Sequence, residues 1–284
     1  LSVLAYALIG IGVGASGTSL LALLATATAP HRRAAAATIT WLMMIFGIAM
    51  TAGIAGSFLD PYSPARLLGV VAVVVTLASL VTMIAVIGIE ARVTATCAPD
   101  HTPFMDGLRE VWSERKTRNF TLFVFLSMNA YFMQELILEP FAGLVWGLTP
   151  GQSTTLSGAQ NGGVFLGMLT VGIAATGLKI GALRSWIIAG CIGSAGSLLV
   201  LASTNLPLTA VVVSLGFFNG MFAVAAIGAM MGLAADGRER REGTRMGLWG
   251  AAQAIAAGFG GLVGAAAVDA GIRHRSDFVY RIRL

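Results

Sequence analysis

The stretch YFMQELILEP places two carboxylates, Glu135 and Glu139, four residues apart within a long apolar run. On a helix, side chains at this spacing share one face, so the two acids are neighbours. Carboxylates so placed repel when both are ionised, and an acid pair of this kind suits the binding or relay of a proton. Gln134 and Asn129 add side-chain amides to the same segment. The alternative use is structural, since such groups also hydrogen-bond to neighbouring helices in lipid.

The depth of these acids in a membrane makes them unusual. At about 1.5 Å per residue from Asn119, Glu135 lies roughly 24 Å along its helix, beyond the midplane of a bilayer. An ionisable group at mid-membrane costs at least ~2.5 kcal/mol on insertion scales, so it normally faces a cavity or a partner. Pro140 follows Glu139 and frees a backbone carbonyl one turn back, near Leu136. We therefore take this segment as the principal candidate site.

The composition indicates an all-α polytopic membrane protein. Of 284 residues, 56% are hydrophobic and 11% are charged, and the mean hydropathy is +0.82. A soluble domain carries roughly 25% charged residues. The apolar runs are continuous rather than alternating, which excludes barrel strands and predicts helices. Eight runs have the length that a membrane-spanning helix needs: 1–28, 34–57, 67–89, 120–148, 155–178, 183–203, 207–234 and 246–268.

Basic residues gather in every second loop that connects these runs. The remaining loops contain a single basic residue, Arg66. By the positive-inside rule the basic loops are cytoplasmic, so the chain as given begins on the outer side of the membrane. The formal charge of +5 thus reflects topology, and we expect no nucleic-acid partner. The residues expected to set the topology, besides those of segment 90–118, are Arg32, Arg33, Lys179, Arg184, Arg241 and Arg245.

Four glycines carry an internal repeat. Gly10 and Gly14 recur 206 residues later as Gly216 and Gly220, and the helix that follows each pair repeats at an offset of 208. The first two predicted helices therefore correspond to the seventh and eighth, which gives a period of six helices and two parallel halves. We expect all four glycines to permit close packing between helices, as small residues do in membranes.

The repeat predicts how the chain is divided. Residues 1–89 form the last three helices of an N-terminal half, and residues 90–118 form a polar cytoplasmic linker. Residues 119–284 form the first five helices of the C-terminal half and a tail. The expected whole is a bundle of six plus six helices, of which helices four through eleven are present.

Two parallel six-helix halves with a basic linker resemble the major facilitator superfamily. Four stretches resemble, more specifically, the PucC/LhaA family of phototrophic bacteria, also called the bacteriochlorophyll delivery family: PHRRAAAATITWLMMIFGIAMTAGIAG, MQELILEPFAGLVWGLTPGQST, GLKIGALRSWIIAG and EGTRMGLWGAAQAIAAGFGG. One departure is that the loop Gly177–Arg184 contains Lys179 but no acid, whereas the superfamily's loop motif pairs Asp with Arg. A gating salt bridge of the usual transporter type is therefore unsupported.

The resemblance implies an assembly factor for light-harvesting complexes that handles or delivers bacteriochlorophyll. It further implies a place in the bacterial inner membrane, in its intracytoplasmic photosynthetic part. The partners implied are antenna polypeptides or the reaction-centre core complex, bacteriochlorophyll or the enzymes that make it, and the lipid bilayer.

The histidines limit how such a pigment would be held. His31, His101 and His274 all fall in predicted loops or tails. A pigment magnesium in the membrane would thus take a ligand other than histidine, and this hard cation prefers oxygen. The candidates for pigment or proton binding, in order, are Glu135, Glu139, Gln134, Asn129 and, in the eighth helix, Gln253.

Other polar and aromatic residues receive structural interpretations. We expect Gln160 and Asn161 to open the fifth helix and, like Asn219, to bond to neighbouring helices. Trp249, near a helix end, is expected to anchor at the membrane interface. No nucleophile–base pair, metal cluster or phosphate loop is apparent, which predicts a non-enzyme without a metal site. Two other functions stay open: a proton-coupled transporter of a small organic molecule, and a purely structural subunit beside an antenna ring.

Overall fold

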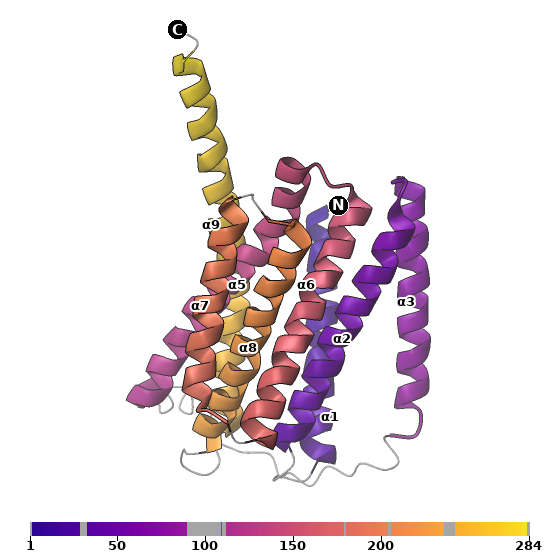
Figure 1. The fold of residues 1–284 in the computed structure, drawn as a ribbon. Coiled ribbons are helices and arrows are strands. Elements are labelled where there is room, and N and C mark those ends of the chain that lie inside the picture. The colour runs from indigo at the N-terminus through magenta and orange to yellow at the C-terminus, as the bar shows by residue number, and fades with distance from the viewer. Residues whose placement is uncertain are drawn as a thin grey trace.

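The structure, a computed structural model, describes residues 2–28, 33–89, 109, 112–178, 180–203, 206–235 and 242–282. Within these ranges the chain folds into helices and contains no strand (Figure 1). The helices are α1 (Ser2–Ala27), α2 (Arg33–Leu59), α3 (Pro64–Val86), α5 (Arg115–Trp146), α6 (Pro150–Val171), α7 (Leu183–Ser203), α8 (Leu208–Ala235) and α9 (Glu242–Ile282). A π-helical segment, Gly172–Gly177, continues α6. The prediction of an all-α polytopic membrane protein is confirmed.

Three helix boundaries differ from the predicted ones by five residues or more when Gly172–Gly177 is counted with α6. α5 begins at Arg115, inside the predicted linker, and α9 continues to Ile282 and projects beyond the bundle (Figure 1). Hydropathy shows where an apolar run ends, but not where the helix ends. Arg and Lys are good helix formers, so both helices extend into polar sequence. α6 begins at Pro150, because Thr149 and Gln152 form a capping box and proline suits the first helical position.

Within the described ranges, six helices are long and apolar enough to cross a membrane. They contain the segments Thr38–Leu59, Pro64–Val86, Arg115–Trp146, Leu183–Ala202, Leu208–Ala229 and Leu248–Ala267. In α1 the apolar part is shorter, Ala7–Gly17. α6 is less apolar because it lies inside the protein: half of its 22 residues are buried, including Gln160 and Asn161. A helix that contacts protein rather than lipid can carry polar side chains where they find partners.

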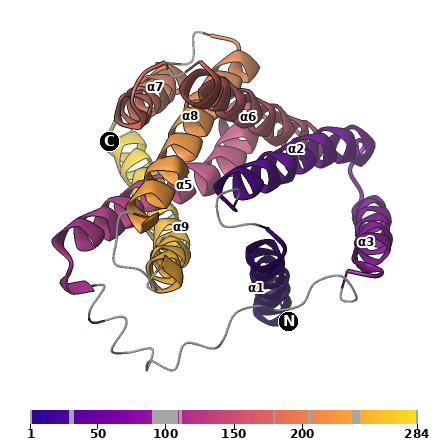
Figure 2. The same ribbon diagram turned by 90° about the horizontal axis from the view of Figure 1, so that it is seen from below.

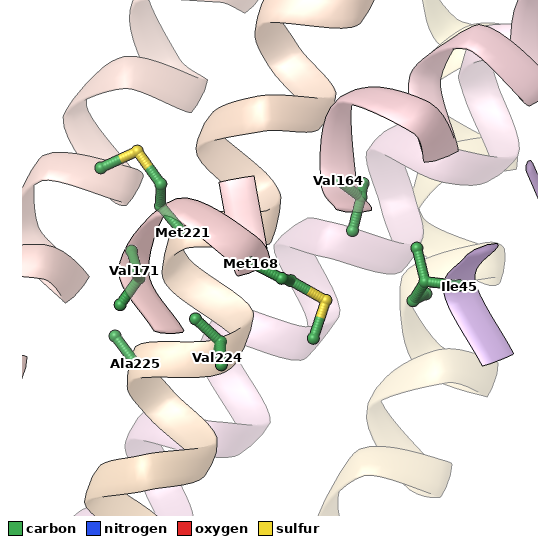
Figure 3. Close-up of a cluster of buried hydrophobic side chains, with 7 residues drawn as sticks. All are labelled: Ile45, Val164, Met168, Val171, Met221, Val224 and Ala225. Atoms are coloured by element: carbon green, nitrogen blue, oxygen red, sulfur yellow. The ribbon is translucent and has the colours of Figure 1, made fainter. Parts of the chain in front are cut away.

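The centre of the bundle is α6, which packs against α2 on one side and α8 on the other (Figure 2). α7 covers α8, and α9 pairs with α5. In Figure 3 the side chains of Ile45 from α2, Met168 from α6 and Met221 from α8 belong to one buried cluster. This cluster joins a helix that precedes residues 90–118 to helices that follow them.

Glycines bring the α6 and α8 backbones into contact. A Cβ on Gly216 would meet the carbonyl oxygen of Gln160, and one on Gly220 would meet that of Val164. This close approach is what the repeat predicted for these two glycines. Gly10 and Gly14 differ, because an added Cβ at either would meet no described atom within 4 Å. The reason is that α1 stands away from the rest of the bundle and touches α2 only slightly (Figure 2).

Trp249 also differs from its expected role. Its ring is fully buried between α5 and α9, packs edge-on against Phe120 with centroids 5.0 Å apart, and donates from Nε1 to Thr121 Oγ1 at 3.1 Å. It is a packing residue rather than an interfacial anchor. Because α9 begins at Glu242, Trp249 lies two turns into the helix, where its side chain packs against α5.

The six-plus-six organisation and its division at residues 90–118 stay predictions. Most of that segment lies outside the described residues. Successive helices do alternate in direction, so the α2–α3, α5–α6 and α7–α8 turns lie at one end of the bundle (Figure 1). That end is the outer side in the predicted topology, and we refer to it below as the outer end.

Candidate functional site

The candidate site lies on the inward face of α5. Leu138 and Ala142 of this helix are buried against Leu156 of α6 and Val212 of α8. Glu135 is one turn before Leu138, on the same side of the helix. Pro140 interrupts the hydrogen-bond ladder but does not end the helix, which continues to Trp146 and closes at Gly147 in the left-handed conformation.

Glu135 and Gln134 carry polar atoms that the protein leaves unsatisfied. Oε2 of Glu135 and Nε2 of Gln134 are both buried, and neither has a hydrogen-bond partner among the described residues. Tyr131 lies one turn earlier on the same face of α5 as Glu135. Native proteins pair nearly all buried polar atoms, since an unmade bond costs about 1–3 kcal/mol. An adjacent acceptor and donor without partners therefore mark a place where a ligand can bind.

Glu139 has different surroundings, although it lies one turn further along the same helix. It is exposed, and its Oε1 accepts a hydrogen bond of 3.2 Å from Ser153 Oγ of α6. Ser153 itself is buried and also bonds to the carbonyl of Pro150 at 3.1 Å. Glu139 thus ties α5 to α6, whereas Oε2 of Glu135 has no hydrogen-bond partner in the part of the chain that the structure describes.

The other candidates lie elsewhere. Asn129 faces α9, since a Cβ on Gly260 would lie 2.8 Å from its backbone oxygen and 3.2 Å from its Oδ1. Gln253 is half-buried on α9. The structure therefore brings together Tyr131, Gln134 and Glu135, and it separates Asn129 from them by turning it to the opposite side of α5.

Polar residues of α6 and α8 also depart in part from expectation. Gln160 and Asn161 lie in the middle of α6, not at its start, because the helix begins ten residues before Gln160. Asn161 Nδ2 bonds to the Ser157 carbonyl of its own helix at 3.0 Å. Asn219 of α8 does join two helices, since its Oδ1 accepts from Ser194 Oγ of α7 at 2.8 Å.

Of the basic residues expected to set the topology, Arg184 is exposed near the start of α7. Arg33 begins α2 and Arg245 lies in the first turn of α9, but their side chains fall outside the described set. Arg32, Lys179 and Arg241 lie outside the described residues altogether. The topological role of these residues stays a prediction.

Sequence reasoning missed Thr149, Ser153 and Asp60. The spacing of Thr149 and Gln152 is a capping-box pattern, so the start of α6 was available in the sequence. No pattern pairs Ser153 with Glu139, or Asp60 with Thr149, because these contacts join different helices. Where the structure describes the chain, no three His, Cys, Asp or Glu side chains gather as a metal site would require.

Comparisons with known proteins point to one family. The family described as PUCC protein matches residues 1–277. The "Bacteriochlorophyll synthase 44.5 kDa chain" of Rhodobacter capsulatus is 67% identical over 274 residues, which are 95% of this chain and 64% of the relative. "Protein PucC" of Cereibacter sphaeroides is 29% identical over 262 residues, 90% of this chain and 56% of that protein.

The chain thus spans less than two thirds of the length of these curated relatives. The same holds for "Protein PucC" of Rhodovulum sulfidophilum, which is 26% identical over 93% of this chain and 60% of its own length. No solved structure matches the chain.

Proposed function

The chain belongs to the PUCC protein family, and from this premise we propose that it assists the assembly of photosynthetic light-harvesting complexes by handling bacteriochlorophyll. The printed name of one relative, a bacteriochlorophyll synthase chain, supports a link to this pigment. The observation that carries the proposal is the buried oxygen of Glu135 that has no partner in the described protein, beside the equally unpartnered amide of Gln134.

The chemistry of these two groups fits such a pigment. When bound, bacteriochlorophyll would supply a magnesium ion, and magnesium prefers oxygen donors. Glu135 Oε2 would be that donor, and the Tyr131 hydroxyl, one turn away on the same face of α5, would hold the carboxylate by donating to it. Gln134 Nε2 would donate to an oxygen substituent on the ring. Glu139 is not needed for binding, since its carboxylate already accepts from Ser153.

The partners and location follow as parts of the same proposal. A multi-pass protein that holds pigment among its helices can meet antenna polypeptides or the reaction-centre core only within a bilayer, so we place it in the intracytoplasmic photosynthetic membrane. The enzymes that make bacteriochlorophyll would act before it. Its helices would belong to a major-facilitator-like bundle of six plus six.

We further propose that the chain carries pigment rather than converting it. The relative named as a synthase chain makes this distinction worth testing. The groups on the inward face of α5 are a carboxylate, an amide and a phenol, and we assign them to binding. Purified protein incubated with bacteriochlorophyll precursors should return them chemically unchanged. A new product formed in proportion to the protein would overturn the non-enzymatic part of the proposal.

The experiment that tests pigment binding is purification of the full-length protein in mild detergent from cells that make bacteriochlorophyll. The near-infrared spectrum and the extracted pigment give the amount bound per chain. We expect about one pigment per chain in the wild type and a loss of at least tenfold in Glu135→Leu, because leucine keeps the volume but offers no ligand. Glu139→Gln is the matched control on the same helix and should retain its pigment.

A well-folded protein without pigment would overturn this proposal. In that case, solute flux driven by a proton gradient in liposomes would indicate a transporter. Co-purification with antenna polypeptides but without pigment would indicate a structural subunit. Equal loss of pigment in the Glu135 and Glu139 variants would mean that the acids act as a pair rather than in the separate roles assigned here.

A further inference from the structure

Two turns at the outer end of the bundle are joined by a hydrogen bond between residues 89 positions apart. Thr149 Oγ1, just before α6, donates to Asp60 Oδ2, just after α2, at 2.8 Å. Asp60 is held in place from its other side, since Arg66 Nη1 donates to its backbone oxygen at 2.6 Å. The α2–α3 turn thus presents a fixed carboxylate to the start of α6.

Thr149 serves two functions at once. Its Oγ1 accepts from the backbone nitrogen of Gln152 at 3.2 Å, and Gln152 Oε1 accepts from the Thr149 nitrogen at 3.0 Å, so the hydroxyl caps α6 while it donates to Asp60. The carboxylate also lies directly over the first turn: a Cβ on Gly151 would be 2.6 Å from Asp60 Oδ2. A negative charge at a helix N-terminus is stabilised by the helix dipole.

Below this polar contact, the α2–α6 interface is made by backbone approach. A Cβ on Gly158 would lie 2.6 Å from the Gly53 nitrogen, and one on Gly56 would lie 2.7 Å from the Thr155 nitrogen. Further inward, Ile45 of α2 packs into the buried cluster of α6 and α8 (Figure 3). The interface therefore has an exposed hydrogen bond at its outer end and tightly packed apolar contacts below.

These two kinds of contact differ in how readily they open. The Asp60–Thr149 bond is exposed, so water can replace each partner at small net cost. The glycine contacts and the buried cluster have no such substitute, because opening them creates empty volume or exposes apolar surface. The outer end is therefore where α2 and α6 can part while the rest of the interface stays closed.

We propose that the Asp60–Thr149 hydrogen bond is a latch that holds the outer ends of α2 and α6 together and whose release lets them separate about the glycine contacts. This inference is independent of pigment binding. Release has a direct consequence for α5, because Ser153 in the first turn of α6 bonds to Glu139. Movement of the α6 start away from α5 would free the Glu139 carboxylate.

Distances between spin labels in the full-length protein test the latch. One label replaces Phe58, 64% exposed near the end of α2, and the other replaces Thr154, near the start of α6, whose hydroxyl bonds to the Pro150 carbonyl of its own helix. Native cysteines, including the exposed Cys191, are first changed to serine. A second pair at Met43 and Thr170, both exposed, reports on the opposite end of the interface.

Asp60→Ala removes the latch and leaves the capping box intact. We expect the ratio of separated to closed outer ends to rise at least tenfold, with the Met43–Thr170 distance unchanged. Ser57→Ala is the control, because among the described residues its hydroxyl bonds to the Ile54 carbonyl of its own helix at 2.7 Å and to nothing else, and it should match the wild type. Asp60→Asn keeps an acceptor oxygen without the charge and should give a smaller rise.

The outcomes decide between the latch and a static contact. If Asp60→Ala does not fold, Asp60→Asn decides alone. Outer distances identical to the wild type in every folded Asp60 variant would overturn the proposal. A distance increase at both ends would also overturn it, because the helices would then separate as a whole rather than about the glycine contacts.

Discussion

A Cβ added at Gly167, near the end of α6, gives the sharpest test of how the central helices pack. The new carbon would meet the backbone of α8 at the carbonyl of Phe217, with the carbonyl carbon at 2.8 Å and the Met221 nitrogen at 3.0 Å. These are backbone atoms, so no side chain can rotate to make room. Gly167→Ala therefore requires α6 and α8 to move apart.

The expected loss can be worked out from two opposing effects. Overpacking a filled interior costs about 1–3 kcal/mol, and a backbone contact places this substitution in the upper half of that range. Alanine regains about 1 kcal/mol over glycine in helix propensity. The net destabilisation is therefore about 1–2 kcal/mol, from the difference between these terms.

The neighbouring Gly162 supplies a matched control. It lies on the same helix, but an added Cβ there would meet nothing within 4 Å. Gly162→Ala should thus gain up to about 1 kcal/mol from propensity alone. The two alanine variants then differ by about 1–3 kcal/mol. At roughly 2–4 °C per kcal/mol, this is a difference of about 2–12 °C in the midpoint of thermal unfolding.

The assay is the fraction of monodisperse protein that remains after heating in detergent, measured by size-exclusion chromatography. We expect Gly167→Ala to fall below the wild type and Gly162→Ala to match or exceed it. Equal midpoints for the two variants would refute the close approach of α6 and α8, and with it the central position of α6.

Two further substitutions test contacts between or at the ends of helices by the same heating assay. Trp249→Phe removes the donor to Thr121 and part of a buried ring, and should cost about 2 kcal/mol; an unchanged midpoint would contradict the buried position. Thr149→Val removes the cap of α6 and should cost about 0.5–2 kcal/mol. Thr154→Val, whose hydroxyl bonds only to the Pro150 carbonyl of its own helix, should stay within about 0.5 kcal/mol of the wild type, and an equal loss in both threonine variants would argue against the capping box.

Much of the fold was predictable because a bilayer leaves few choices for the backbone. With no water to satisfy N–H and C=O groups, long apolar runs must be helical, so the order of the helices could be read from hydropathy. The start of α6 was readable too, since Thr149, Pro150 and Gln152 form a local capping pattern. Hydropathy alone placed it five residues late because those residues are polar.

The sequence by itself also determined that Gln134, Glu135 and Glu139 share a membrane helix, because their spacing is a property of one helix. Only the tertiary structure decided that Glu139 meets Ser153 while Glu135 keeps an unpartnered oxygen. It likewise decided that a Cβ on Gly216 or Gly220 would meet another backbone, whereas one on Gly10 or Gly14 would meet no described atom within 4 Å. The physical reason is that periodicity fixes which residues share a face, but the neighbour of that face is chosen by the packing of helices distant in sequence.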